Sequence, residues 1–348
     1  MEQSDLVPMT VNGELLPAIA PSPMAQAGQA ANQAAQDRIF ADYHARKAPQ
    51  TLRRKKADLL LFWEYLEAAG IPTGDLMHDP QEWAGMTWGL VAGFVEWQLQ
   101  QGYAINSINA RLATVKTYCQ LALRAGVLDH AAHAQIRTVT GYRGKEGRNV
   151  DQTRAKTRQG PKKALPTEFS GKEAAALKQQ PDTPQGRRDA VLMCLLLDHG
   201  LRCGEVAGLR VEHVNLPAGT FTFYREKVDL VQTHKLTLDT YRALVAYLTL
   251  DAPPATGPLL LGSRKDGTLA GRMSTRAINK RVSVLGKGVG IATLSPHDCR
   301  HYWTTAAIRG GSDIKSVQEG GGWKSPHMPL QYASRGAIAN AGIHLAET

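Results

Sequence analysis

Residues 190–205 read Ala-Val-Leu-Met-Cys-Leu-Leu-Leu-Asp-His-Gly-Leu-Arg-Cys-Gly-Glu. The apolar run predicts a buried helix over Arg187–Leu197, and it is far too short to span a bilayer. Gly200 ends this helix, and Arg202 follows between two glycines, where the helix end holds a guanidinium rigidly. A rigid guanidinium suits bidentate binding of a phosphate. An internal ion pair between Arg202 and Glu205 explains the same stretch more simply when it is taken alone.

A second cationic motif follows Ser295, which precedes a proline at the first position of a predicted helix. His297 and Arg300 are three residues apart and therefore share one helix face. They lie near the helix start, where free backbone N–H groups and the helix dipole favour an anion. An ordinary capped helix with polar surface residues accounts equally well for this motif when it is taken alone.

The stretch from Glu319 to Ala333 adds Trp323 and, nine residues later, Tyr332. Each aromatic residue by itself is an ordinary packing residue. The ordered set Gly-Leu-Arg-x-x-Glu, His-x-x-Arg-His, Trp and Tyr resembles the tyrosine recombinases, or phage integrase family, over residues 165–333. The resemblance implies a mostly α fold with a small antiparallel β-sheet in the catalytic domain. It also implies a two-domain DNA clamp, in which a helical core-binding domain precedes an α+β catalytic domain.

The resemblance assigns catalytic roles by position. Arg202 and Arg300 match the two phosphate-binding arginines, and Tyr332 matches the nucleophile. His297 matches the histidine of the second motif and is expected to act as a base or phosphate donor. Glu205 matches the supporting acidic position after the first arginine. Two guanidiniums on the non-bridging oxygens would offset the phosphate charge, in the role that metal ions fill elsewhere.

Two further roles depend on the region between the motifs and on the C-terminal stretch. Trp323 falls where the family has His or Trp. The family also has a lysine on a β-hairpin between the two arginines, and it is the expected general acid for the leaving 5′-hydroxyl. The alternating stretch Thr220–Tyr224 predicts one strand, with Lys235–Leu238 as its antiparallel partner. We assign the acid to Lys227 after the first strand, with Lys235 as the alternative.

The sequence departs from the family at two places. Gly320–Gly322 replaces the usual Leu-Gly before the His/Trp position. Pro326 and Pro329 precede the nucleophile, and Pro329 is expected to limit the helix that carries Tyr332. We therefore expect this segment to be loosely held until DNA and a neighbouring protomer order it. Apolar residues after Tyr332, ending with Leu345, suit a helix that docks either on a neighbour or on its own chain.

The composition is consistent with a DNA partner. The 348 residues include 41 Lys or Arg and 31 Asp or Glu, which gives a formal charge of +10. This charge favours an acidic partner, of which nucleic acid is the commonest. The four scattered cysteines include no CxxC pair, so a zinc site or disulfide framework is not expected. Without a signal peptide or an apolar span, we expect a cytoplasmic, nucleoid-associated protein that needs no metal or cofactor.

The sequence predicts four segments. Residues 1–36 are expected to form a flexible tail, and residues 37–140, with no strand alternation, a helical core-binding (SAM-like) domain. Residues 141–164 form a basic linker, interpreted either as a flexible connector or as a strap along phosphates, and residues 165–348 form the catalytic domain. The predicted DNA contacts, each equally explained as a solvated surface residue, are Arg53, Arg54, Lys55, Lys56, Arg143, Lys145, Arg148, Lys162, Lys163, Arg276 and Lys280.

The resemblance implies site-specific recombination of double-stranded DNA, typical of mobile elements, through a 3′-phosphotyrosyl intermediate and a Holliday junction. It needs neither metal nor ATP, because the phosphotyrosyl ester retains the bond energy for rejoining. A dimer on each site and a tetramer in the synapse are expected. Two alternatives remain: a type IB topoisomerase, which reseals the same strand, and a non-catalytic DNA-binding protein on the same fold.

Overall fold

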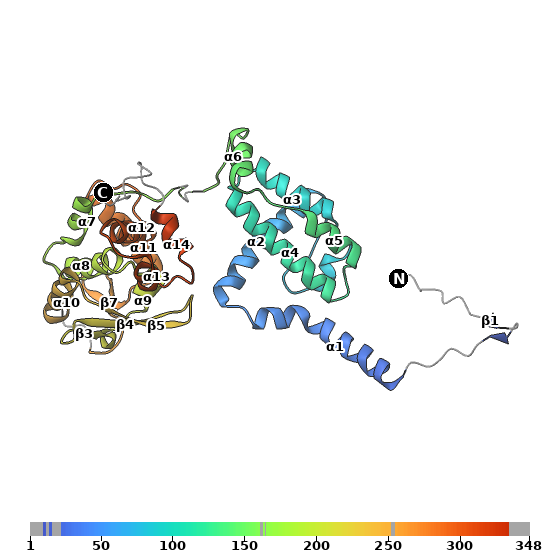
Figure 1. Ribbon diagram of the computed structural model, residues 1–348, viewed down its shortest axis with the longest axis horizontal. Coiled ribbons are helices and arrows are strands. Elements are labelled where there is room, and N and C mark those ends of the chain that lie inside the picture. The colour runs from blue at the N-terminus through green and yellow to red at the C-terminus, as the bar shows by residue number, and fades with distance from the viewer. Residues whose placement is uncertain are drawn as a thin grey trace, which may run out of the picture. The chain divides into compact units, whose positions relative to one another are not determined.

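The computed structural model describes residues 10–11, 14–15, 22–160, 163, 165–251 and 255–333. The chain divides into two compact units, Met1–Lys162 and Lys163–Thr348 (Figure 1). Each unit has its own hydrophobic core. The structure is mostly helical, and a three-stranded antiparallel sheet lies in the second unit. The expected fold class is therefore confirmed. Within the described residues, no helix is both long enough and apolar enough to cross a bilayer.

The first unit is built from helices around an aromatic core. Its centre contains Phe62, Trp83, Phe94 and Tyr118, and the ring centroids of Phe62 and Phe94 are 4.9 Å apart. Local capping fixes several helix starts; for example, the hydroxyl of Thr87 accepts a hydrogen bond from the N–H of Leu90. The helices are α1 (Pro23–Ala45), α2 (Pro49–Ala68), α3 (Trp88–Gln100), α4 (Ile105–Arg124), α5 (His130–Thr138) and α6 (Gly144–Gln152), with a short 3₁₀ turn at Pro80–Trp83.

The ends of the first unit differ from the sequence-based expectation. The expected tail over residues 1–36 is helical from Pro23 onward, because the hydroxyl of Ser22 caps α1 and a proline occupies its first turn. Residues 1–9, 12–13 and 16–21 of that tail lie outside the described residues. Two short strands, β1 (Thr10–Val11) and β2 (Glu14–Leu15), pair antiparallel, although no strand was expected before residue 140.

The expected linker 141–164 also carries more structure than predicted, because it contains α6. After α6, Arg154 donates to the backbone carbonyls of Leu99 (3.2 Å) and Tyr103 (3.0 Å), which attaches this segment to the first unit. At the start of the second unit, the Lys163 ammonium bonds Asp298 at 2.5 Å. The basic residues of this region are therefore partly used for internal contacts.

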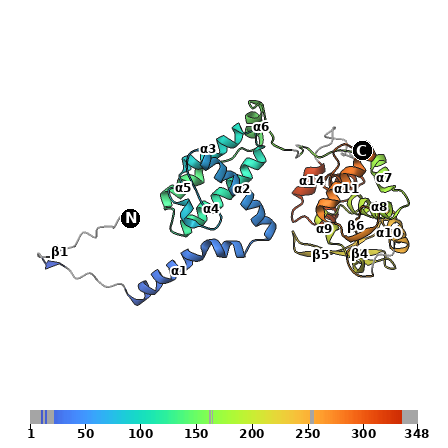
Figure 2. The ribbon, with the colours of Figure 1, turned by 180° about the vertical axis from the view of Figure 1, so that it is seen from behind.

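The second unit surrounds α8, whose residues 191–197 are all buried. Both ribbon views place the β4–β5 hairpin at the edge of this unit opposite α7 (Figures 1 and 2). The helices are α7 (Gly171–Lys178), α8 (Pro184–Leu197), α9 (Cys203–Gly208), α10 (Leu238–Leu250), α11 (Thr275–Gly288), α12 (Pro296–Arg309), α13 (Ile314–Gly321) and α14 (His327–Ala333), and a 3₁₀ turn lies at Val211–His213. The strands are β3 (Val214–Asn215), β4 (Thr220–Arg225) and β5 (Leu230–Lys235), in the order β3-β4-β5, and the separate pair β6 (Leu261–Ser263) and β7 (Leu269–Arg272).

The β4–β5 hairpin sets the position of several candidate site residues. Its register pairs Thr220 with Lys235 at one end and Arg225 with Leu230 at the other. The strand expected at Lys235–Leu238 is therefore wrong, since the returning strand ends at Lys235. The chain reverses earlier than predicted because a tight turn over residues 226–229 includes Asp229 at a φ of 54°. Along β4 the side chains of Phe221, Phe223 and Arg225 are buried.

Candidate active site

Two guanidiniums from distant parts of the sequence converge on one backbone turn. Arg202 precedes the first residue of α9, and Arg300 lies in the first half of α12. Arg300 donates to the carbonyl oxygens of Gly200 (2.5 Å) and Gly321 (2.6 Å), and Arg202 donates to that of Gly322 (3.3 Å). Gly200 has a φ of +59°, and a Cβ atom there would lie 2.3 Å from the ring of Trp303, so only glycine fits.

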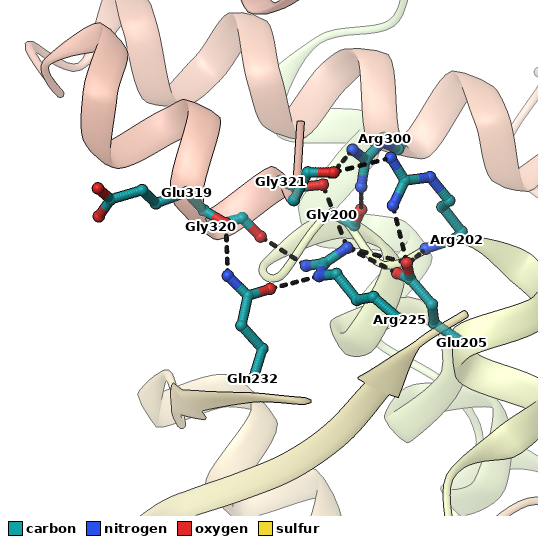
Figure 3. A network of polar contacts seen from close by, with 10 residues as sticks. Gly200, Arg202, Glu205, Arg225, Gln232, Arg300, Glu319, Gly320 and Gly321 are labelled. Carbon is teal, nitrogen blue, oxygen red and sulfur yellow. Dashed lines mark hydrogen bonds and ion pairs between the residues drawn. The ribbon is translucent and has the colours of Figure 1, made fainter. Parts of the chain in front are cut away.

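A third guanidinium, that of Arg225, joins this group, as Figure 3 shows. Its Nη1 lies 2.9 Å from both carboxylate oxygens of Glu205. Glu205 also accepts from the Arg202 side chain and from the Arg202 backbone N–H, each at 2.8 Å. One carboxylate is therefore shared between two arginines. Arg225 was not among the residues predicted from the sequence, although the alternation Phe221, Phe223, Arg225 places it on the buried face of β4.

The electrostatics of this cluster favour an anion. The cluster holds three guanidiniums, those of Arg202, Arg225 and Arg300, and the carboxylate of Glu205, which together carry a formal excess of two positive charges. Burial, followed by the charge of the neighbouring Arg202, lowers the pKa of Arg300 to about 9. Burial also lowers the pKa of Arg225. A bound phosphate would relieve this repulsion and favour the charged forms of Arg225 and Arg300.

Tyr332 lies next to this cluster, in α14. Its side chain is 7% exposed, and its ring centroid is 5.7 Å from that of Trp323. The Trp323 indole in turn lies under the Arg300 guanidinium, with 4.0 Å between Cζ and the ring centroid. Pro329 was expected to limit this helix, and α14 begins at His327, two residues before it. Pro329 falls in the first turn of α14, where its missing N–H has no helical partner to lose.

The histidines of α12 form a pair beside the tyrosine. His297 is exposed, and its Nε2 lies 3.2 Å from Nε2 of His301. The His301 ring centroid is 4.0 Å from that of Tyr332. His301 was not among the expected site residues. Its spacing of one helical turn from His297 is the signal that identifies it, because residues four apart share a helix face.

The two candidate lysines lie at opposite ends of the β4–β5 hairpin. Lys227 is exposed in the turn next to Arg225, and Lys235 is exposed at the far end of β5. Five residues of strand separate these ends, which corresponds to roughly 17 Å. The end of the hairpin that carries Lys227 lies nearer to the Gly320–Gly322 turn, because the side-chain amide of Gln232 donates to the carbonyl of the preceding residue, Glu319, at 2.5 Å. The geometry therefore favours Lys227 over Lys235.

The expected DNA contacts of the first unit lie mainly on exposed surfaces. Helix α2 exposes Arg53, Arg54 and Lys56. The Nε of Arg54 also lies 3.6 Å from a carboxylate oxygen of Asp58. Lys55 is half-buried, with its ammonium 5.6 Å from the ring centroid of Tyr43. The exposed set is completed on and beside α6 by Arg143, Lys145 and Arg148.

In the second unit, Arg276 and Lys280 are exposed on α11. Lys162 lies outside the described residues. The structure differs from the expectation at Lys163, whose ammonium bonds the carboxylate of Asp298 and the hydroxyl of Thr167. Lys163 is therefore engaged as an internal anchor. Within the described residues, no group of three or more His, Cys, Asp or Glu side chains is arranged to hold a metal ion.

Comparison with known proteins identifies the family of this site. Residues 168–336, which run from the start of the second unit to just past Tyr332, match the phage integrase family. The second unit therefore carries a domain of the phage integrase family, the family of the tyrosine recombinases. This recombinase is 25% identical over 316 residues to tyrosine recombinase XerC of Xylella fastidiosa (strain 9a5c), covering 86% of this chain and 94% of the relative. It is 25% identical over 281 residues to tyrosine recombinase XerD of Pseudomonas aeruginosa, covering 78% and 82%.

Solved structures share the fold of this recombinase. A lambda integrase dimer bound to a COC′ core site has a TM-score of 0.57 and 14% identity, covering 92% of this chain and 83% of that chain. The Tn1549 transposon integrase in complex with circular intermediate DNA has a TM-score of 0.59 and 13% identity, covering 87% and 96%. The recombinase is thus an enzyme of site-specific DNA recombination.

Proposed function

We propose that this recombinase cleaves and rejoins DNA strands through a covalent bond between Tyr332 and a backbone phosphate. The observation that carries the proposal is the convergence of Arg202 and Arg300 on one turn, with the Tyr332 ring joined to Arg300 through Trp323. Guanidiniums placed where charge develops stabilise the transition state of phosphoryl transfer. In this proposal they bind the two non-bridging oxygens of the scissile phosphate.

Each proton and bond in the cleavage step has an assigned place. The Tyr332 oxygen attacks phosphorus and loses its proton to His297, directly or through water. The bond between phosphorus and the 5′-oxygen breaks as Lys227 donates a proton to the leaving 5′-hydroxyl. The product is a 3′-phosphotyrosyl ester, whose bond energy is retained. Attack by a 5′-hydroxyl from another duplex reverses the step on a new strand, so neither metal nor ATP enters the scheme.

Exchange of strands between two duplexes requires several copies of the chain. We propose a dimer on each recombination site and a tetramer in the synapse, with a Holliday junction between the two rounds of exchange. The first unit serves as the core-binding domain, and the exposed basic residues of α2, α6 and α11 contact phosphates. The protein acts on DNA in the cytoplasm. The residues after Ala333, which were expected to dock either on a neighbour or on their own chain, lie outside the described residues.

Trapping on nicked DNA tests the proposal. A pool of nicked duplexes of random sequence releases a short strand after cleavage, so that the enzyme cannot rejoin the DNA and stays attached. We expect wild type to form a covalent protein–DNA complex and Tyr332→Phe to bind the same DNA without forming it. A covalent complex with Tyr332→Phe would show that the nucleophile is another residue.

The trapped sequence then allows the alternatives to be separated. Two duplexes that carry this sequence should give Holliday junctions and exchanged products with wild type. Relaxation of supercoiled DNA without exchange between duplexes would favour the topoisomerase instead. Binding without any covalent complex in wild type would favour the non-catalytic DNA-binding protein.

A further inference from the structure

Arg225 is a fully buried cation that no assigned catalytic role uses. Its side chain is 0% exposed, so it cannot contact DNA directly. A buried guanidinium is costly unless its donors are bonded. Here Nη1 bonds the Glu205 carboxylate and the Gly321 carbonyl, Nη2 bonds the Gly320 carbonyl at 2.6 Å, and Nε bonds Gln232. Arg225 therefore acts through the groups that it holds.

On one side, Arg225 holds Glu205, the ion-pair partner of Arg202. Arg202 and Arg300 together form the proposed phosphate clamp. Arg225 donates to both oxygens of Glu205, while Arg202 donates to Oε1 through its side chain and to Oε2 through its backbone N–H. The Arg202 side chain is 25% exposed, so it remains accessible to a phosphate. Without Arg225, the Glu205 carboxylate would be free to follow the Arg202 guanidinium into a closer ion pair and so withdraw it from the phosphate position.

On the other side, Arg225 holds the turn Gly320–Gly322. The carbonyl of Gly321 accepts from both Arg225 (3.1 Å) and Arg300 (2.6 Å), so this single oxygen couples the two guanidiniums. The residue after this turn is Trp323, which lies under Arg300. A shift of the turn would therefore move both the carbonyl and the indole that orient Arg300.

The absence of side chains in this turn is what admits Arg225. A Cβ atom on Gly322 would lie 2.5 Å from Cδ of Arg225, and the backbone there has a φ of +60°. A Cβ atom on Gly321 would lie 1.9 Å from the Trp323 ring. The family usually has Leu-Gly immediately before the position of Trp323, so its leucine corresponds to Gly321. A leucine there would displace the Trp323 ring. Gly322 therefore leaves room for Arg225, and Gly321 leaves room for the Trp323 ring that lies under Arg300.

We propose that Arg225 is a positioning residue of the phosphate clamp, which aligns Arg202 through Glu205 and Arg300 through the Gly320–Gly322 turn. The inference rests on the proposed function. It predicts that the geometry of the guanidinium fork matters as well as its charge, because lysine cannot bond Glu205, Gly320 and Gly321 together.

Single-turnover cleavage of the trapped duplex at saturating protein tests this role. We expect Arg225→Lys to slow covalent-complex formation about 10- to 100-fold while DNA affinity stays near that of wild type, the effect expected when charge-assisted bonds are lost. The matched control is Arg188→Lys. Arg188 is 1% exposed and bonds Asp189 and the Leu261 carbonyl, so its loss lowers stability without affecting the clamp.

A duplex with an uncharged methylphosphonate at the cut site separates positioning from general loss of structure. Because the clamp has less charge to offset there, the difference between wild type and Arg225→Lys should largely close. Wild-type cleavage by Arg225→Lys on the ordinary phosphate would overturn the proposal. So would a defect of equal size on both substrates, or an equal defect in Arg188→Lys.

Inorganic phosphate supplies a readout that does not require cleavage. We expect it to raise the thermal unfolding midpoint of wild type and of Arg188→Lys, and to raise that of Arg225→Lys much less. If phosphate gives this pattern while wild type forms no covalent complex, the positioning role is supported and the proposed cleavage chemistry is contradicted. Equal stabilisation of all three proteins would overturn the positioning role.

Discussion

The guanidinium of Arg300 lies over the indole of Trp323, with 4.0 Å between Cζ and the ring centroid. The same indole has its centroid 5.7 Å from that of Tyr332. Trp323 therefore connects the clamp arginine Arg300 to the proposed nucleophile through contacts of its indole ring.

Replacing Trp323 tests this connection. A cation–π contact contributes about 0.5–2 kcal/mol, so Trp323→Ala should slow cleavage about 2- to 30-fold at saturating DNA. Trp323→Phe retains an aromatic face and should recover much of the loss. Trp88→Ala, at an exposed position of α3, serves as the control. Equal rates for Trp323→Ala and wild type would show that the indole has no part in the step.

The two clamp arginines are expected to be essential for chemistry and dispensable for binding. Arg202→Ala and Arg300→Ala should each lose at least about 100-fold in single-turnover cleavage, the scale seen when one preorganised donor to a developing charge is removed. Gel-shift affinity for the same duplex should change little, because many other phosphates are contacted. Normal cleavage by either variant would contradict the clamp.

The choice between Lys227 and Lys235 can be made with a modified leaving group. Lys227→Ala should fail on the normal duplex and regain cleavage when sulfur replaces the 5′-bridging oxygen, because a thiol of pKa near 8.5 leaves without a general acid. Lys235→Ala should cleave both duplexes as wild type does. If instead Lys235→Ala fails on the normal duplex and is rescued by the sulfur, while Lys227→Ala cleaves both duplexes, then Lys235 is the general acid.

Local signals explain which parts of this structure the sequence predicted. The helices predicted over Arg187–Leu197 and after Ser295 follow from apolar spacing and from a capping residue, which act within a few residues. α1 was underestimated because its helicity comes from an alanine- and glutamine-rich composition, without an apolar stripe to mark it. Of its described residues, Phe40 is buried.

The sequence predicted only those site residues that lie within its motifs. Arg202, Arg300 and Tyr332 each fell within a recognisable pattern, and the structure brings them to one region. The sharing of Glu205 between Arg202 and Arg225 joins a helix start to a strand end 20 residues away, and nothing local in the sequence encodes that contact. Arg225 was further hidden because the predicted strand was ended at Tyr224, one residue too early.

DNA affinity should depend steeply on salt. Each phosphate neutralised contributes about −0.9 to the slope of log K against log salt concentration. Replacing Arg53, Arg54 and Lys56 together with glutamine should therefore flatten the slope by about 2.7 if all three bind phosphates. Fluorescence anisotropy with a labelled duplex measures this change. An unchanged slope would show that these three side chains of α2 bind no phosphates.

Two histidines of the second unit should make its stability sensitive to acid. His199 is 3% exposed and bonds the Thr240 hydroxyl at 3.0 Å, and burial lowers its pKa to about 3. Burial, followed by the charge of Arg225, lowers the pKa of His234 to about 4. Both rings are therefore neutral in the folded protein at pH values where the unfolded chain, with an ordinary histidine pKa near 6.5, already binds protons.

The sign of the effect follows from this difference in bound protons. Below about pH 6.5 the unfolded state binds more protons, so the free energy of unfolding falls as the pH falls toward 4. His234 alone should cost about 2 kcal/mol between pH 7 and pH 5. Urea unfolding of His234→Gln should therefore show a pH-dependent loss about 2 kcal/mol smaller than that of wild type. His213→Gln, which lies outside this buried pair in the turn before β3, should keep the wild-type dependence. If His234→Gln and wild type lose stability in parallel, protonation of His234 is not what limits the folded state in acid.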